Sequence, residues 1–285
     1  MLALFVHSRG MANILHLEKQ TMVIHALAEG NSIRSIERMT NIHRDTIMRL
    51  GVKVGQTCAS LLDEKMQNLE LGSIEVDEIW GFIGKKQKQV TTSDDKHLVG
   101  DVWTYIALDV QTKLIPSYVV GKRDAYHTNA FMFDLSARVK NRVQISSDSM
   151  QSYAAAVERG FGSGVDYAQI VKTYASDDRY PQGKYSAPEV VSVEKNVIMG
   201  TPREALISTS HVEKQNHTLR MHCRRLTRLT NAFSKKLENF KAAIGLNFAY
   251  YNFVKTHGSI RCTPAMAAGI MPSALTVRDL VEMAQ

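Results

Sequence analysis

The sequence contains few of the residues and patterns that mark secreted or membrane-spanning proteins. Its 285 residues include only three cysteines and six prolines, and the cysteines form no CxxC pair, which argues against a zinc ribbon or a disulfide framework. No apolar run approaches the roughly 18 residues that a membrane-spanning helix needs. Because 44% of the residues are apolar, the chain can bury the cores of one large and one small domain. We therefore expect a folded protein of the reducing cytoplasm, with no membrane partner.

Acidic residues are outnumbered by basic ones, and the excess of positive charge is concentrated in one segment. The formal net charge is +7. Between residues 211 and 241, eight basic side chains accompany two acidic ones, so this segment alone carries an excess of six. An acidic polymer is the expected partner, and nucleic acid is the commonest one for a soluble basic protein. A membrane surface is the less common alternative.

A single carboxylate stands at the head of this basic segment. Helical spacing predicts one long helix over residues 210–236, with one stripe that combines an acid and three possible phosphate ligands and a second, apolar stripe that faces a core. The first stripe consists of Glu213, His217, Arg220 and Arg224, and the second of Val212, Leu219, Leu226 and Phe233. The alternative is a solvated basic face. A metal-binding interpretation requires further carboxylates, because several acids commonly share a divalent cation.

The first 71 residues have the spacing of a DNA-binding unit. Helices are predicted over residues 17–28, after Ser32, and over residues 43–54, which is the pattern of a helix-turn-helix. In such a unit the last helix lies in the major groove, where Arg44, Thr46 and Arg49 would face the bases. The alternative is a trihelical packing module without a DNA-binding role. Residues 58–71 are predicted to form a charged amphipathic connector.

From residue 74 the apolar period changes from 3.6 to 2, which indicates a β-strand with Asp77 opposite the apolar Ile74 and Val76. Strands from Val102 and Lys113 complete an antiparallel meander. On its own, Asp77 is equally well explained as a polar residue on an exposed sheet face.

A helix over residues 124–139 then leads into a fourth strand, VQISSD, and this order favours a right-handed crossover to a parallel partner. Asp148 ends that strand, at the edge where α/β sheets gather ligands. The alternative for Asp148 is capping of the helix predicted over residues 150–159. A fifth strand over residues 166–174, an insertion at about 175–209 and a helix over 237–253 follow.

The acidic residues and their order resemble a DDE transposase of the insertion-sequence-one type, in the RNase H-like and retroviral integrase superfamily. The motif VDEIW matches the first Asp of that family, the strand-end SD the second, and HVEKQN the Glu. The resemblance implies that Asp77, Asp148 and Glu213 form a catalytic, metal-binding triad. It continues through RRLTRLTNAFSKKLEN and YYNFVKTHGSIRCTPAMAAG and covers about residues 75–269. His211, Asn216 and His217, which are close to Glu213 in sequence, are weaker candidates.

The resemblance also implies a fold class and a domain organisation. We expect an α/β protein with an RNase H-like mixed five-stranded sheet flanked by helices, preceded by an all-α helix-turn-helix domain. The helix-turn-helix domain and connector occupy residues 1–71, the catalytic domain 72–254, and a C-terminal tail 255–285. One departure concerns the N-terminal zinc segment of some family members, because no residues here would bind that zinc.

The activity implied by the resemblance is metal-dependent DNA cleavage at transposon ends, followed by transfer of the 3′-hydroxyl into target double-stranded DNA. Two Mg²⁺ ions are the expected cofactors, and Mn²⁺ is an expected substitute. We expect a homo-oligomer on DNA, located in the cytoplasm with the nucleoid. Two alternatives stay open, a non-catalytic DNA-binding regulator and an RNase H-like nuclease without joining activity. The expected DNA contacts are Arg44, Thr46, Arg49, Arg220, Arg224, Arg225 and Arg228.

Overall fold

The centre of the protein is a mixed six-stranded sheet in the order β3-β2-β1-β4-β5-β6. The computed structural model describes residues 15–174 and 190–285. The first three strands form the predicted antiparallel meander, β4 and β5 run parallel to β1, and β6 is antiparallel to β5. The strands are β1 (Ser73–Ile83), β2 (Gly100–Asp109), β3 (Tyr118–Gly121), β4 (Val143–Asp148), β5 (Val165–Tyr174) and β6 (Val190–Met199).

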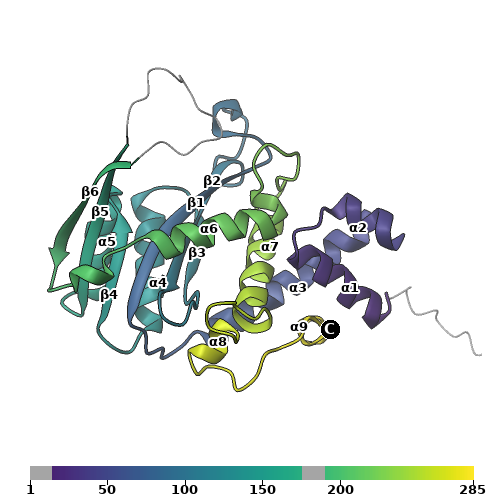
Figure 1. Cartoon of the computed structure of the whole chain (residues 1–285). Helices are drawn as coiled ribbons and strands as arrows, with labels where there is room; N and C mark the ends of the chain where they lie inside the picture. The colour runs from purple at the N-terminus through teal and green to yellow at the C-terminus, as the bar shows by residue number, and fades with distance from the viewer. Residues whose placement is uncertain (1–14, 175–189) are drawn as a thin grey trace, which may run out of the picture.

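The prediction of five strands is wrong, because β6 comes from within the segment predicted as an insertion. Its valines Val191, Val193 and, four positions further, Val197 follow a period of 2, and the strand pairs with β5 along its length. The richness of residues 175–209 in Ser, Pro, Gly and charge obscured this short period-2 pattern. The remainder of that prediction, residues 175–189, lies outside the described residues. Figure 1 shows β6 at the outer edge of the sheet.

Helices cover both faces of the sheet. The crossover helix α4 (Ala125–Arg138) begins at Asp124, whose carboxylate accepts the backbone N–H of His127 at 2.9 Å, and it is followed by α5 (Gln151–Phe161). On the other face lie α6 (Ser210–His222) and α7 (Leu237–Ala249), and α7 continues into a π-helical turn. Figure 1 shows α6 running across the sheet toward α7.

The long basic helix predicted over residues 210–236 is shorter in the structure. The α6 helix ends at His222 and is followed by a single 3₁₀ turn, Arg224–Leu226, and an irregular segment. Leu226 is buried through this turn, where a side chain on Gly81 of β1 would meet it at 3.1 Å. Arg224 therefore does not share a helical stripe with Glu213, and that part of the prediction is wrong.

The three predicted N-terminal helices are present, but the third is longer than expected. They are α1 (Leu17–Ala28), α2 (Ile33–Thr40) and α3 (Arg44–Lys65). The hydroxyl of Ser32 caps α2 by accepting the Ser35 N–H at 3.0 Å. Residues 58–65 of the predicted connector are the last part of α3, which packs on α7, and residues 66–71 lead from this helix to β1. A Cβ on Gly55 would lie 2.2 Å from the Ala242 carbonyl, so the absence of a side chain allows the two helices to cross closely.

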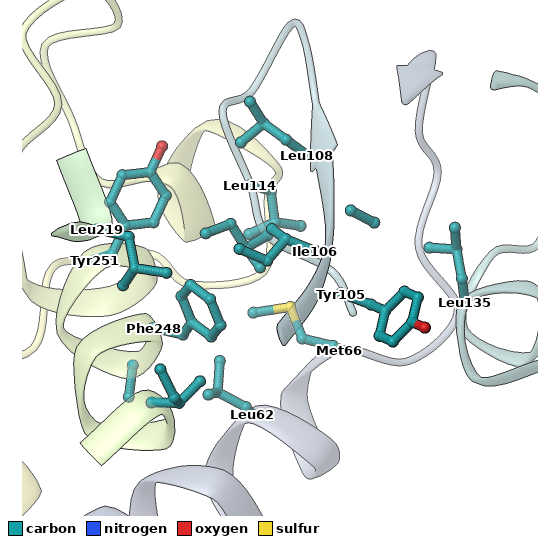
Figure 2. Packing of buried hydrophobic residues seen from close by; sticks show 14 of the residues in the cluster. Leu62, Met66, Tyr105, Ile106, Leu108, Leu114, Leu135, Leu219, Phe248 and Tyr251 are labelled. Atoms are coloured by element: carbon teal, nitrogen blue, oxygen red, sulfur yellow. The ribbon is translucent and has the colours of Figure 1, made fainter. Parts of the chain in front are cut away.

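One hydrophobic core joins these helices to the sheet. Figure 2 shows Leu62 of α3 and Met66, which directly follows the helix, beside Phe248 of α7 and close to the β2 residues Tyr105 and Ile106. The last segment contributes α8 (Pro264–Ala267) and α9 (Val277–Glu282), and α9 places buried side chains in the same core. None of the helices in the described part of the chain combines the length and the apolar character needed to cross a bilayer.

Candidate metal site

The two central strands bring acidic side chains to one point. Parallel pairing matches Ser73 of β1 with Gln144 of β4, an offset of 71 positions, and the same offset sets Asp148 at the level of Asp77. Pairing between the strands ends at Glu75, so Asp77 lies beside the end of β4. The sequence prediction that a strand end carries the second acid therefore agrees with where the structure places Asp148.

Three carboxylates meet at this point. One oxygen from each of Asp77, Glu78 and Asp148 lies within 4.8 Å of the other two. Burial, together with the negative charges of Glu78 and Asp148, raises the pKa of Asp77 to about 7. Burial and the charge of Asp148 also raise the pKa of Glu78. The cluster thus concentrates negative charge that a proton or a cation would neutralise.

Glu78 is absent from the sequence-based triad, although it is adjacent to Asp77. Its carboxylate accepts hydrogen bonds from Arg123 Nε at 2.6 Å and from the Tyr153 hydroxyl at 3.0 Å. Successive residues of a strand face opposite sides of the sheet, so the alternation rule argues against a shared site for neighbours. The signal available in the sequence was the acidic pair in VDEIW.

The helix-capping alternative for Asp148 is only partly realised. Its Oδ1 accepts the N–H of Met150 at 3.0 Å. However, α5 starts at Gln151 with Met150 at its N-cap position and no side-chain cap. The other carboxylate oxygen, Oδ2, lies 4.0 Å from Arg123. Asp148 therefore holds a turn with one oxygen and presents the other toward the cluster.

The α6 helix lies over the acids, and the α6 side chain that contacts them is Asn216, one of the weaker candidates from the sequence. Asn216 Nδ2 donates to Asp77 Oδ2 at 2.8 Å. Glu213, three residues earlier on α6, is paired with Lys172 of β5 and accepts the Thr209 hydroxyl at 2.7 Å. Within the described residues, the structure thus brings Asp77 and Asp148 together with Glu78, and it places Glu213 outside this three-carboxylate group.

A second buried carboxylate fixes the position of α6. Glu75 is completely buried and accepts the backbone N–H groups of His211 at 2.7 Å and Val212 at 2.9 Å, together with a bond from His211 Nδ1 at 2.9 Å. These N–H groups belong to the first turn of α6, where the helix dipole favours a negative charge. Glu75 therefore attaches the helix to β1 two residues before Asp77.

The donor set suits a hard divalent cation. All three clustered side chains offer carboxylate oxygens, and Mg²⁺ and Mn²⁺ prefer oxygen ligands. Asn216 adds an amide oxygen, Oδ1, that is buried and has no hydrogen-bond partner among the described residues. An unpaired buried acceptor beside three acids fits a site that takes up a cation.

Comparisons with known proteins give only distant matches. No protein-family model matches the sequence, and no curated protein matches it. Among solved structures, the chain is similar to the Mos1 transposase paired-end complex with the left transposon end, at 12% identity over 54% of this chain and 60% of that one, with a TM-score of 0.21. A piggyBac transposase synaptic complex with hairpin DNA matches at 9% identity over 97% and 73%, with a TM-score of 0.41. The Mos1 strand transfer complex matches at 13% identity over 53% and 57%, with a TM-score of 0.20.

The arginines in and after α6 differ in their exposure and in whether they hydrogen-bond to other groups of the protein. Arg220 donates to the carbonyls of Leu226 at 3.0 Å and Trp80 at 3.4 Å, and burial and the charge of Arg228 lower its pKa to about 10. Arg225 donates to the Ala232 carbonyl at 3.3 Å. Arg228 is exposed, and Arg224 is half-buried in the 3₁₀ turn.

The residues predicted to read DNA bases lie at the beginning of α3. Arg44 and Arg49 are exposed there, and Thr46 is half-buried. The Arg44 N–H donates to Glu37 of α2 at 3.0 Å, which ties the start of α3 to the preceding helix. This end of α3 carries exposed basic side chains, whereas its other end packs on α7.

Proposed function

We propose that this protein is a DDE-type transposase of the insertion-sequence-one type, which cleaves DNA at transposon ends and transfers the 3′-hydroxyl into target DNA. The observation that carries the proposal is the convergence of Asp77, Glu78 and Asp148 within 4.8 Å at the end of β4. The sequence resemblance, which selects two of these three acids independently of the structure, supports it.

The proposed catalytic acids are Asp77, Asp148 and Glu213, which would hold two Mg²⁺ ions or, in their place, Mn²⁺. Such cations reduce the repulsion between a nucleophile and the phosphodiester and stabilise the leaving oxygen. Lys172 now holds the Glu213 carboxylate. A divalent cation at Glu213 would have to compete with that single ammonium group for the carboxylate. Arg123 orients Glu78 beside the acids through two guanidinium nitrogens, and its positive charge opposes the rise in the pKa of Glu78 that burial and Asp148 cause.

DNA binding is proposed for two separate surfaces. Arg44, Thr46 and Arg49 would read the element's ends in the major groove. The basic segment after α6 would contact the phosphate backbone through Arg220, Arg224, Arg225 and Arg228. Arg220 bonds two carbonyls in the structure, but a guanidinium carries five N–H donors, so some of them are available to a phosphate. A homo-oligomer would hold both ends of one element together.

The test is a cleavage and joining assay with labelled DNA that carries the sequences flanking the gene. We expect nicked and joined products with Mg²⁺ or Mn²⁺ and none in EDTA. Asp77→Asn, Asp148→Asn and Glu213→Gln should each lower cleavage by about 10³-fold, because a metal ligand supplies several kcal/mol of charge stabilisation. Asp63→Asn is the matched control, since that side chain is 72% exposed on α3 and pairs with Arg138.

Other outcomes of the same assay separate the alternatives. DNA binding without cleavage by the unmodified protein would indicate a regulator. Nicked products without joined ones would indicate a nuclease. Unchanged cleavage by any one of the three variants would remove that residue from the triad.

A further inference from the structure

The amide of Asn216 is the group of α6 that contacts the acidic cluster. Asn216 is only 8% exposed, and its Nδ2 lies 2.8 Å from Asp77 Oδ2. The second polar atom of the same amide, Oδ1, is buried without a hydrogen-bond partner among the described residues. A buried oxygen in this state is unfavourable unless another group satisfies it. The structure thus leaves one acceptor unexplained at the acids.

The position of this amide is fixed from outside the site. Glu75 holds the first turn of α6 through the backbone of His211 and Val212, and Val212 and Leu219 bury the helix against the sheet. Asn216 therefore remains above Asp77 without depending on its own hydrogen bond to keep the helix in place. Because other contacts hold α6 in place, packing alone does not require a polar side chain at position 216.

A neutral oxygen suits this place better than a further carboxylate. Three negative charges already lie close together, and burial and mutual repulsion raise the pKa of Asp77. An amide oxygen supplies lone pairs to a cation without adding a fourth charge, and Asn carbonyl oxygens are common ligands of hard cations. The amide N–H meanwhile stabilises the Asp77 carboxylate when it is ionised.

We propose that Asn216 belongs to the cation site, with Oδ1 as an oxygen donor to a divalent cation held by Asp77 and Nδ2–H as the group that steadies Asp77. This inference rests on the cation site of the proposed function. It assigns to α6 a second contributor, three residues after Glu213, and gives each atom of the Asn216 amide a separate role.

The test measures Mn²⁺ binding to the full chain by calorimetry, without DNA, so that it does not depend on activity. Asn216→Leu keeps the branched shape of the side chain and removes both polar atoms, and it should weaken Mn²⁺ binding at least about tenfold, as loss of groups around a metal typically does. The matched control is Gln215→Leu, because Gln215 is a neighbouring amide of α6 that is 6% exposed. That control should leave Mn²⁺ affinity unchanged.

Asn216→Asp separates the two atoms of the amide. It keeps an oxygen donor and loses the N–H that reaches Asp77. We expect Mn²⁺ affinity at or above that of the unmodified protein, a lower melting temperature without cation, and a larger rise in melting temperature when Mn²⁺ is added. Mn²⁺ affinity as weak as that of Asn216→Leu would mean that only the N–H matters, and the ligand assignment would be wrong.

Asp77→Asn distinguishes failure of this inference from failure of the proposed function. If Asp77→Asn abolishes Mn²⁺ binding while Asn216→Leu binds Mn²⁺ normally, the cation site stands and Asn216 only attaches α6 to β1. If Asp77→Asn binds Mn²⁺ as well as the unmodified protein does, the cation site itself is misplaced. Should Asn216→Leu fail to fold, as judged by circular dichroism, the Asn216→Asp result decides.

Discussion

Two carboxylates on the same face of β1, Glu75 and Asp77, lie two residues apart beneath α6 and are compensated in different ways. Glu75 is surrounded by donors, two backbone N–H groups and one imidazole nitrogen. Asp77 receives one side-chain donor, from Asn216, and faces two other acids. Hydrogen-bond donors of the protein therefore compensate the charge of Glu75, whereas the charge of Asp77 is compensated only in part.

The difference follows from where each residue meets α6. Glu75 meets the start of the helix, where free backbone N–H groups point along the axis toward it. Asp77 lies one to two turns further along, where the helix backbone is already hydrogen-bonded and only side chains can contribute. The same strand face thus carries an anchoring carboxylate and, next to it, a carboxylate suited to an external cation.

The largest effect expected from this comparison is on stability. Glu75→Gln replaces an acceptor by an amide whose NH₂ faces N–H donors, so it should lower the free energy of unfolding by about 3 kcal/mol. Asp77→Asn, the same isosteric change two residues away, should leave it unchanged or raise it, because repulsion among the acids is relieved. Urea unfolding of both variants without cations measures this. Equal losses for the two would remove the distinction between them.

The fold was predictable wherever the apolar pattern reports burial on one face. The alternation around Ile74 and Val76 and the strand-end position of Asp148 predicted β1 and β4 because each strand places a regular set of side chains in the core. The prediction of one long helix over residues 210–236 was wrong because the helical spacing of apolar residues continues beyond the end of α6 at His222. Leu226 and Phe233 continue the seven-residue spacing of Val212 and Leu219, but Leu226 is buried through a 3₁₀ turn, and Phe233 lies half-buried against Phe82 from an irregular segment.

The site was predictable to the extent that its residues occupy strand ends or family motifs. Asp148 met both conditions, and Asp77, which lies in the middle of β1, met the second. Glu78 did not, because strand alternation assigns it to the opposite face, and its approach depends on β4 pairing no further than Glu75. The Asn216 contact depends on the rotation of α6 relative to β1, which Glu75 sets, and no local sequence pattern reports a helix rotation.

The next effect in size is on the pH dependence of cation binding. The pKa of Asp77 is raised from its usual value of 3.8 to about 7. The folded protein therefore holds a proton there between about pH 4 and pH 7 that the unfolded chain releases, so the stability contributed by this proton is lost as the pH rises through 7. A cation must displace the same proton. Mn²⁺ affinity should therefore rise about tenfold per pH unit below 7 and level off above it.

Calorimetric titrations with Mn²⁺ at about half-unit steps from pH 5.5 to 8.5 measure this dependence. The charged groups that face Asp77 are Glu78, Asp148 and Arg220. Glu75→Gln is the informative companion, since Glu75 is already compensated and its replacement should not move the midpoint. An affinity that is independent of pH between 5.5 and 7 would show that Asp77 is ionised throughout, contrary to the comparison with Glu75.

The smallest effect expected concerns the imidazole that completes the Glu75 anchor. A carboxylate only accepts hydrogen bonds, so His211 must carry its proton on Nδ1 to donate to Glu75. His211→Ala removes this bond but keeps both backbone bonds to Glu75. The His211 side chain is 43% exposed, so water can replace part of the lost interaction. The loss should be about 1 kcal/mol, clearly less than for Glu75→Gln, and Mn²⁺ affinity should not change. A loss as large as that of Glu75→Gln would mean that the side chain, rather than the helix N-terminus, compensates the buried charge.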